Sequence, residues 1–276
     1  MARLTPVAVW ALVRELREAA DDRDAIVVAG ASALAEALRR ELGRGARPGA
    51  VREGSFAGAA GLVHVVASAV TEDDEKLLLE AHRRGVPIVA VVTDPGFGGR
   101  IPHVLATDIV RVPAGSGFPV DEIARVLARK FGEAGTTVAA RVPVVRRAVC
   151  EELIASFSRT NALLGAAVFV KGADLPVLTL NQLRMTLRIG LAHGVEIERE
   201  RLPEIAAVIG SALGLRKLAR RVLPRTPVSA WALKAAIAYG GTRAIGEAAM
   251  RYFEAVAAAE PARAAPPAGG PLTPTV

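Results

Sequence analysis

Short apolar runs alternate with amphipathic segments in the first half of the chain. Four runs of mainly valine, isoleucine and alanine have the length of buried strands, over 25–30, 62–68, 86–94 and 108–115. Helical spacing of apolar residues follows over 32–42, 72–84 and 119–132, and shorter signals predict helices over 5–20 and 101–106. Strands that alternate with helices predict a parallel sheet wrapped by crossover helices. We therefore expect residues 1–135 to form a three-layer α/β domain.

The second half of the chain has no strand pattern. Residues 143–170 are expected to form one long helix or two, followed by helices over 179–193, 199–223 and 228–259. A break in the last helix is expected at Gly240, where two glycines stand together. The pattern predicts an all-α domain over 141–259. The proline- and glycine-rich tail over 260–276 is expected to be disordered.

The segment over 179–193 is apolar nearly all round. Four leucines (Leu180, Leu183, Leu187 and Leu191) share one side, and Asn181, Arg184 and Arg188 form a narrow polar stripe. Such a helix belongs in a packed interior or in a bilayer. A buried arginine needs an acidic partner. We therefore expect Arg184 and Arg188 to form structural ion pairs, with Asp174 or Glu247 as partners.

Composition excludes several kinds of site. The 276 residues contain one cysteine and four histidines, with no spacing typical of a zinc site or a disulfide framework. We expect no metal and no cofactor. The net charge is +7, and part of the excess falls in one cluster, which consists of Arg216, Lys217, Arg220, Arg221 and Arg225. This basic cluster suits an anionic lipid surface or nucleic acid, but no aromatic residues are interleaved for base stacking, so we expect no nucleic-acid partner.

The apolar runs are too short for a confident membrane span. No uninterrupted run reaches the roughly 18–20 residues that a spanning helix needs. The amino terminus does not resemble a secretory signal. We therefore expect peripheral or shallow membrane contact rather than a transmembrane helix.

The first strand is followed by the sequence GASALAEA, where a parallel α/β domain would hold a phosphate. The P-loop pattern GxxxxGK[ST] needs glycines for close backbone approach, a lysine for the phosphate and a hydroxyl for magnesium. Here Gly30 matches the first glycine, but Ala35, Glu36 and Ala37 replace the others. A carboxylate at the lysine position would repel a polyphosphate, so this pattern predicts no nucleotide binding.

In this segment the first half of the chain resembles an Era-like GTPase domain whose nucleotide-binding residues have been replaced. Asp94 stands at the end of the segment similar to the guanine-reading motif, with Val91 and Val92 in place of its Asn and Lys. Asp94 is better explained as a turn residue before Pro95. A flavodoxin-like or Rossmann-like origin stays open, since GxGxxG is absent as well.

The second half resembles the YcjF-type bacterial domain of unknown function. Residues 176–194 and 215–254 carry the likeness, with these markers: Gln182, Arg184, Arg188, Gly240, Gly241, Thr242 and Gly246. That family occurs beside Era-like GTPase domains and in inner-membrane proteins, so the resemblance implies membrane association and no known catalysis.

Together these features predict a non-catalytic scaffold or regulatory protein on the cytoplasmic side of the inner membrane. The expected partner is an anionic membrane surface or a membrane protein, and a homo-oligomer stays open. The alternative is an enzyme that binds a nucleotide through a non-standard site at the carboxyl ends of the strands.

Overall fold

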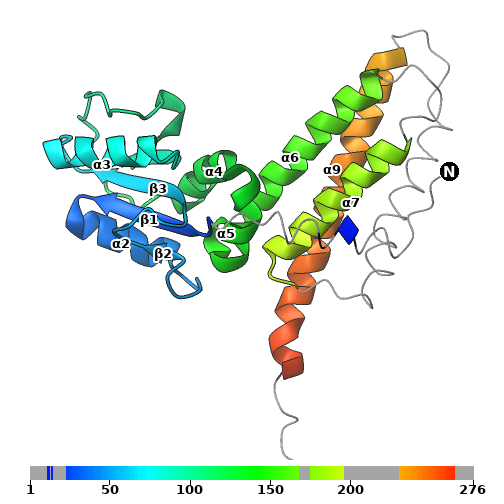
Figure 1. The fold of residues 1–276 in the computed structure, drawn as a ribbon, viewed down its shortest axis with the longest axis horizontal. Helices are drawn as coiled ribbons and strands as arrows, with labels where there is room; N and C mark the ends of the chain where they lie inside the picture. The colour runs from blue at the N-terminus through cyan, green and yellow to red at the C-terminus, as the bar shows by residue number, and fades with distance from the viewer. Residues whose placement is uncertain (1–10, 13, 15–22, 168–174, 196–229, 265–276) are drawn as a thin grey trace, which may run out of the picture.

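The computed structural model describes residues 11–12, 14, 23–167, 175–195 and 230–264 (Figure 1). The basic cluster, the expected helix over 199–223 and the last part of the tail lie outside these ranges. So does most of the expected helix over 5–20.

Five parallel strands form the sheet in the order β2-β1-β3-β4-β5. The strands are β1 (Ala25–Gly30), β2 (Val51–Arg52), β3 (Ala59–Val66), β4 (Ile88–Val92) and β5 (Ile109–Arg111). All four predicted strands are confirmed. The two-residue edge strand β2 was not predicted, because it is too short to carry a hydrophobic pattern. The strand order is that of flavodoxin-like doubly wound sheets, which agrees with the alternative origin.

Helices cover both faces of the sheet (Figure 1). On one face α2 (Ser32–Leu42) and α4 (Val120–Phe131) pack against inward residues such as Val63 and Val65. On the other face α3 (Glu72–Arg83) packs against Leu62 and Val66. The alternation along β3 therefore divides its side chains between two apolar clusters.

The amino terminus of α3 has a capping box. The Thr71 side chain accepts a hydrogen bond from the Asp74 backbone N–H at 3.2 Å, and the Asp74 carboxylate accepts one from the Thr71 backbone N–H at 2.9 Å. The short helix expected over 101–106 is wrong in position. A 3₁₀ turn, η1 (Ala106–Asp108), follows that segment instead.

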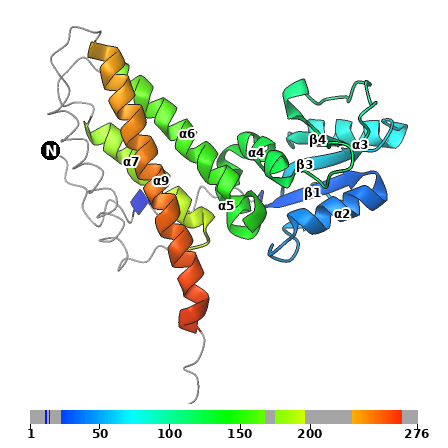
Figure 2. The same ribbon diagram turned by 180° about the vertical axis from the view of Figure 1, so that it is seen from behind.

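A short connection joins the sheet to the helical half. It consists of η2 (Gly132–Ala134) and α5 (Gly135–Arg141), and neither was predicted. Val138 and Ala139 of α5 are completely buried in the same apolar cluster that covers one sheet face. That cluster continues into the helical half, so the core does not stop at the predicted boundary near 135–141. Figure 2 shows α4 and α5 between the sheet and the long helices.

The helical half contains α6 (Pro143–Ala167), α7 (Leu175–Ala192) and α9 (Ala230–Ala264), which lie side by side (Figures 1 and 2). Residues 143–167 form one helix rather than two, and α7 begins four residues before the expected start at Thr179. The predicted break at Gly240 is wrong, because α9 continues through both glycines. It also extends to Ala264, five residues into the expected tail. Within the described ranges, none of the helices is both long enough and apolar enough to cross a membrane.

Candidate functional site

The predicted erased P-loop has a different geometry from a phosphate-binding loop. Helix α2 begins at Ser32, only two residues after the end of β1 at Gly30. Ala35, Glu36 and Ala37 therefore lie inside the helix and not in a loop. The Glu36 carboxylate accepts a hydrogen bond from Arg39 Nε at 2.9 Å and lies 3.5 Å from Arg40 Nε. The segment therefore matches the P-loop pattern only in its residue spacing. The connection between β1 and α2 is too short to form a phosphate-binding loop.

Strands β1 and β3 also leave little room for a ligand between their carboxyl ends, where the strand order reverses. In open parallel sheets the ligand crevice lies outside the carboxyl ends of the strands at this point. Here Gly30 pairs with Val65, and the Ala31 N–H donates to the Val65 carbonyl at 3.0 Å. A Cβ on Gly30, whose φ is +107°, would lie 2.1 Å from the Val65 oxygen. The backbones therefore remain in contact beyond the end of the sheet.

Asp94 lies at the carboxyl end of β4, where the GTPase resemblance placed the guanine-reading aspartate. Its Oδ1 accepts a hydrogen bond from the Gly96 N–H at 2.8 Å. This contact to the backbone two residues ahead is typical of an Asx turn. The geometry favours the interpretation of Asp94 as a turn residue.

Two markers of the helical resemblance, Gln182 and Thr242, meet in a buried polar network. Thr242 of α9 is fully buried, and its hydroxyl accepts hydrogen bonds from Asn161 Nδ2 at 2.9 Å and Gln182 Nε2 at 3.1 Å. Asn181 Nδ2 donates to Asn161 Oδ1 at 3.0 Å, so three helices are joined. Because buried polar groups must be paired, this network fixes how α6, α7 and α9 align.

The polar stripe of α7 is only partly as predicted. Arg188 forms an ion pair, but its partner is Glu133, with Nη2 2.8 Å from Oε2. Glu247, one of the two expected acids, pairs with Arg243 at 2.8 Å. Asp174, the other, lies outside the described residues, so its pairing stays a prediction. Arg184 is half-buried and does not lack a partner. The error for Arg188 arose because the short connection that carries Glu133 has no sequence pattern.

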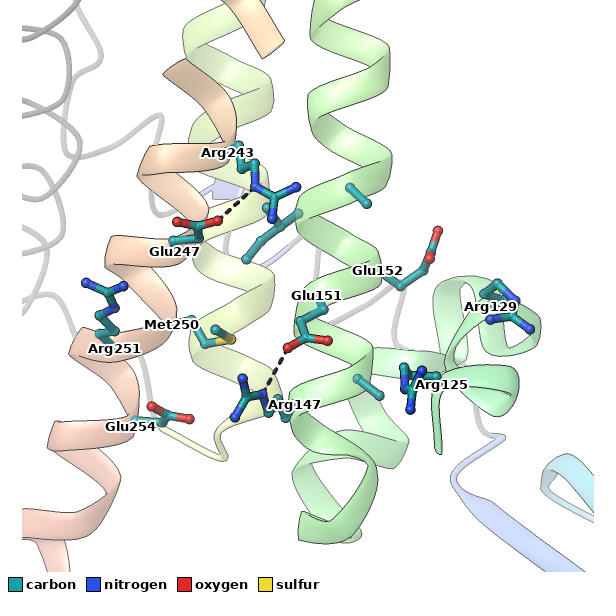
Figure 3. A pocket seen from close by; sticks show the side chains of 13 residues that line it. Arg125, Arg129, Arg147, Glu151, Glu152, Arg243, Glu247, Met250, Arg251 and Glu254 are labelled. Atoms are coloured by element: carbon teal, nitrogen blue, oxygen red, sulfur yellow. Dashed lines mark hydrogen bonds and ion pairs between the residues drawn. The ribbon is translucent and has the colours of Figure 1, made fainter. Parts of the chain in front are cut away.

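A groove of about 630 Å³ lies where α4 meets the flanks of α6 and α9 (Figure 3). Its lining is dominated by charge, with five arginines and four glutamates around a few apolar side chains. The charged residues are Arg125, Arg129, Arg147, Glu151, Glu152, Arg243, Glu247, Arg251 and Glu254. None of them was singled out as a site residue from the sequence, because they are distributed over three helices far apart in the chain.

Several of these charges are already paired along their own helices. Arg147 Nε lies 2.9 Å from Glu151 Oε1, and Arg243 Nε lies 2.8 Å from Glu247 Oε1 (Figure 3). These pairs raise the pKa of Arg147 and Arg243 through the hydrogen bond to the adjacent glutamate. Arg125, Arg129 and Arg251 have no ion pair within the described part of the chain. The groove therefore offers fixed charges of both signs and three arginines whose charge an outside acidic group could pair with.

The groove does not combine its carboxylates with a nucleophile–base pair. No histidine, serine or cysteine of the described residues lines it, and three of its four glutamates are held in ion pairs: Glu151, Glu152 and Glu247. The chain's single cysteine, Cys150, lies inside α6, and burial raises its pKa to about 12, so the reactive thiolate is not formed. The described residues also contain no group of three or more histidine, cysteine or acidic side chains that could hold a metal ion.

No family model matches the chain, and no curated protein matches it.

Proposed function

We propose that the protein is a non-catalytic scaffold or regulatory protein that binds a membrane partner on the cytoplasmic side of the inner membrane. The observation that supports this function best is the charged groove between α4, α6 and α9. A concave surface with fixed charges of both signs suits a protein segment of complementary charge, because electrostatic complementarity gives specificity and register. Small-molecule sites, in contrast, are mostly apolar.

The fold assignment behind this proposal has two parts. For the α/β part we favour the flavodoxin-like origin over an erased Era-like GTPase, because of the strand order and the short β1–α2 connection. For the helical part we keep the YcjF-type module. Its support is that the markers Gln182 and Thr242, sixty residues apart, bond to each other. The contact with the membrane itself is proposed for the basic cluster.

Site-specific photo-crosslinking in cells tests the groove. A photoreactive residue in place of Arg251 should give one discrete adduct in the membrane fraction. The same residue in place of Arg84, an exposed arginine on α3, should give none. Charge reversal by Arg125→Glu and Arg129→Glu should remove the adduct, because the groove then repels an acidic segment. Equal adducts from both positions, or an adduct that survives the reversal, would contradict the groove as the docking site.

Vesicle flotation of the full-length protein tests the basic cluster. Five cations near an anionic surface contribute about 1 kcal/mol each, so binding should be strong to anionic vesicles and weak to neutral ones. Replacing Arg216, Lys217, Arg220, Arg221 and Arg225 by glutamine should abolish most of it. The matched control replaces five exposed cations of the α/β part (Arg40, Arg44, Lys76, Arg83 and Arg84) and should float almost as well as the wild type. Equal losses would mean that only net charge matters.

A further inference from the structure

A second cavity lies on the next flank of α6, and it differs from the charged groove in volume and lining. It has a volume of about 300 Å³ and is enclosed by the end of α4, the connection to α5, and helices α6 and α7. Val149, Leu153 and Phe157 give it apolar walls. Its polar lining residues are Arg129, Glu133, Glu152, Ser156, Thr160, Asn181 and Arg188. A cavity of this size with a few convergent polar groups is at the lower end of the range for small-molecule sites.

Arg188 is the cation fixed at this cavity. Only 11% of its side chain is exposed. Its Nε donates to the Thr136 hydroxyl at 3.3 Å, and its Nη2 contacts the Glu133 carboxylate at 2.8 Å and the Glu133 carbonyl at 3.4 Å. Nη1 has no partner among the described residues. Helix α7 and these contacts hold the guanidinium in place and leave part of its donor capacity unused.

The acid that pairs with Arg188 is held much less firmly. The Glu133 side chain is 76% exposed, and apart from the ion pair its carboxylate has no described contact. Exposed carboxylates contribute little to an ion pair, because water competes for them. The Glu133 carboxylate can therefore break this ion pair and become hydrated at low cost. The Arg188 guanidinium stays buried when the pair breaks.

The surrounding charges favour an anion when Glu133 leaves. Glu152, the other acid of the cavity, is bound by Arg159 at 2.8 Å. Arg129 stands at the rim and has no ion pair among the described residues. Two arginines would then face the cavity without an acid to neutralise them. Planar guanidinium groups bind carboxylates through paired, charge-assisted hydrogen bonds.

From this geometry we propose that the cavity binds a small organic carboxylate with an apolar body, and that Glu133 occupies the anion position when the ligand is absent. The ligand carboxylate replaces Glu133 on Arg188, and its aliphatic or aromatic part packs against Leu153 and Phe157. The site goes beyond the docking groove, since it takes a different class of ligand and is centred on Arg188 of α7, although Arg129 and Glu152 line both. Ligand binding would then free the Glu133 side chain in η2.

Titration of the full-length protein with benzoate tests the site, with benzamide as the neutral counterpart of nearly the same shape. Benzoate should bind with saturation and raise the melting temperature, and benzamide should do neither. Glu133→Gln should tighten benzoate binding about three- to fivefold, because it removes a competing exposed ion pair. Glu122→Gln, an exposed glutamate of α4 outside the cavity, should leave the affinity unchanged.

Two further variants separate binding from folding. Phe157→Ala should weaken benzoate binding but not acetate binding, because only benzoate uses the apolar wall. Arg188→Gln should abolish both, with circular dichroism showing whether the helices are intact. If Arg188→Gln does not fold, the binding data for Glu133→Gln and Phe157→Ala test the proposed site without it. The proposal is overturned if benzoate and benzamide act alike, if Glu133→Gln leaves the affinity unchanged, or if only a glutamate-rich peptide binds.

Discussion

His64 is an ionisable side chain in the middle of β3 and is almost completely buried. Its Nε2 lies 3.2 Å from Asp74 Oδ1, but the angles do not make a hydrogen bond, and neither ring nitrogen has a hydrogen-bond partner among the described residues. Burial lowers the pKa of His64, and the Asp74 carboxylate opposes this shift only in part. Burial also lowers the pKa of His193 in α7. Both histidines are therefore neutral in the folded protein at neutral pH.

These two histidines should make the protein sensitive to mild acid. A folded-state pKa below the ordinary value of 6.5 means that the unfolded chain binds protons first. The stability is therefore complete above about pH 6.5 and falls as the pH drops towards the folded-state pKa. The melting temperature should decrease steadily below pH 6.5, and His64→Gln should reduce the slope. An exposed control, His82→Gln, should retain the wild-type slope, and a slope unaffected by His64→Gln would contradict this assignment.

At the scale of elements, two glycines of α9 lie in different surroundings: Gly246 is closely packed and Gly240 faces open space among the described residues. A Cβ on Gly246 would lie 2.5 Å from Cγ1 of the buried Ile154, so α6 and α9 are tightly packed there. A Cβ on Gly240 meets nothing described within 4 Å. The sequence had suggested that Gly240 breaks the helix, but packing against α6 and α7 holds α9 together through it. Gly190 of α7 has a similar role to Gly246, since its Cβ would lie 2.8 Å from the Phe253 ring.

Alanine substitutions at the two glycines of α9 should have opposite effects. Gly246→Ala should destabilise the protein by about 1–3 kcal/mol, because it overpacks the contact with Ile154. Gly240→Ala should stabilise it by about 0.5–1 kcal/mol, because alanine loses less backbone entropy than glycine in a helix interior. Urea denaturation of the two variants gives both values. A stabilising Gly246→Ala would mean that the two helices are further apart than described.

The elements that sequence predicts well are those whose own pattern is long enough. The strands β1, β3 and β4 are continuous apolar runs, and α3 carries its own capping box, so they were predicted without knowledge of their neighbours. The strand β2 and the helix α5 were missed, because two and seven residues carry no period. The charged groove was missed for another reason: its residues look like ordinary exposed helix charges, and only the packing of α4 and α9 on α6 brings them together.

At the scale of the whole molecule, the α/β part and the helical part share one apolar core. The cluster extends from Val63 and Val65 through Val138 of α5 to Phe253 of α9. The connection formed by η2 and α5 thus lies between the two parts in the sequence and also packs against both of them in the structure. Both cavities lie at this junction, so the sheet acts as a support for α4 rather than as the carrier of a site. This arrangement supports the interpretation of the protein as a binding scaffold and not as an enzyme that uses the sheet edge.

Calorimetric titration with magnesium–nucleotide tests this central claim most directly. The short β1–α2 connection, the close contact of Gly30 with Val65 and the position of Glu36 inside α2 leave no phosphate-binding loop. GTP and ATP at millimolar concentration should therefore give no saturable heat with the full-length protein. Saturable binding in the micromolar range would contradict the account and would make the nucleotide-binding enzyme the better description.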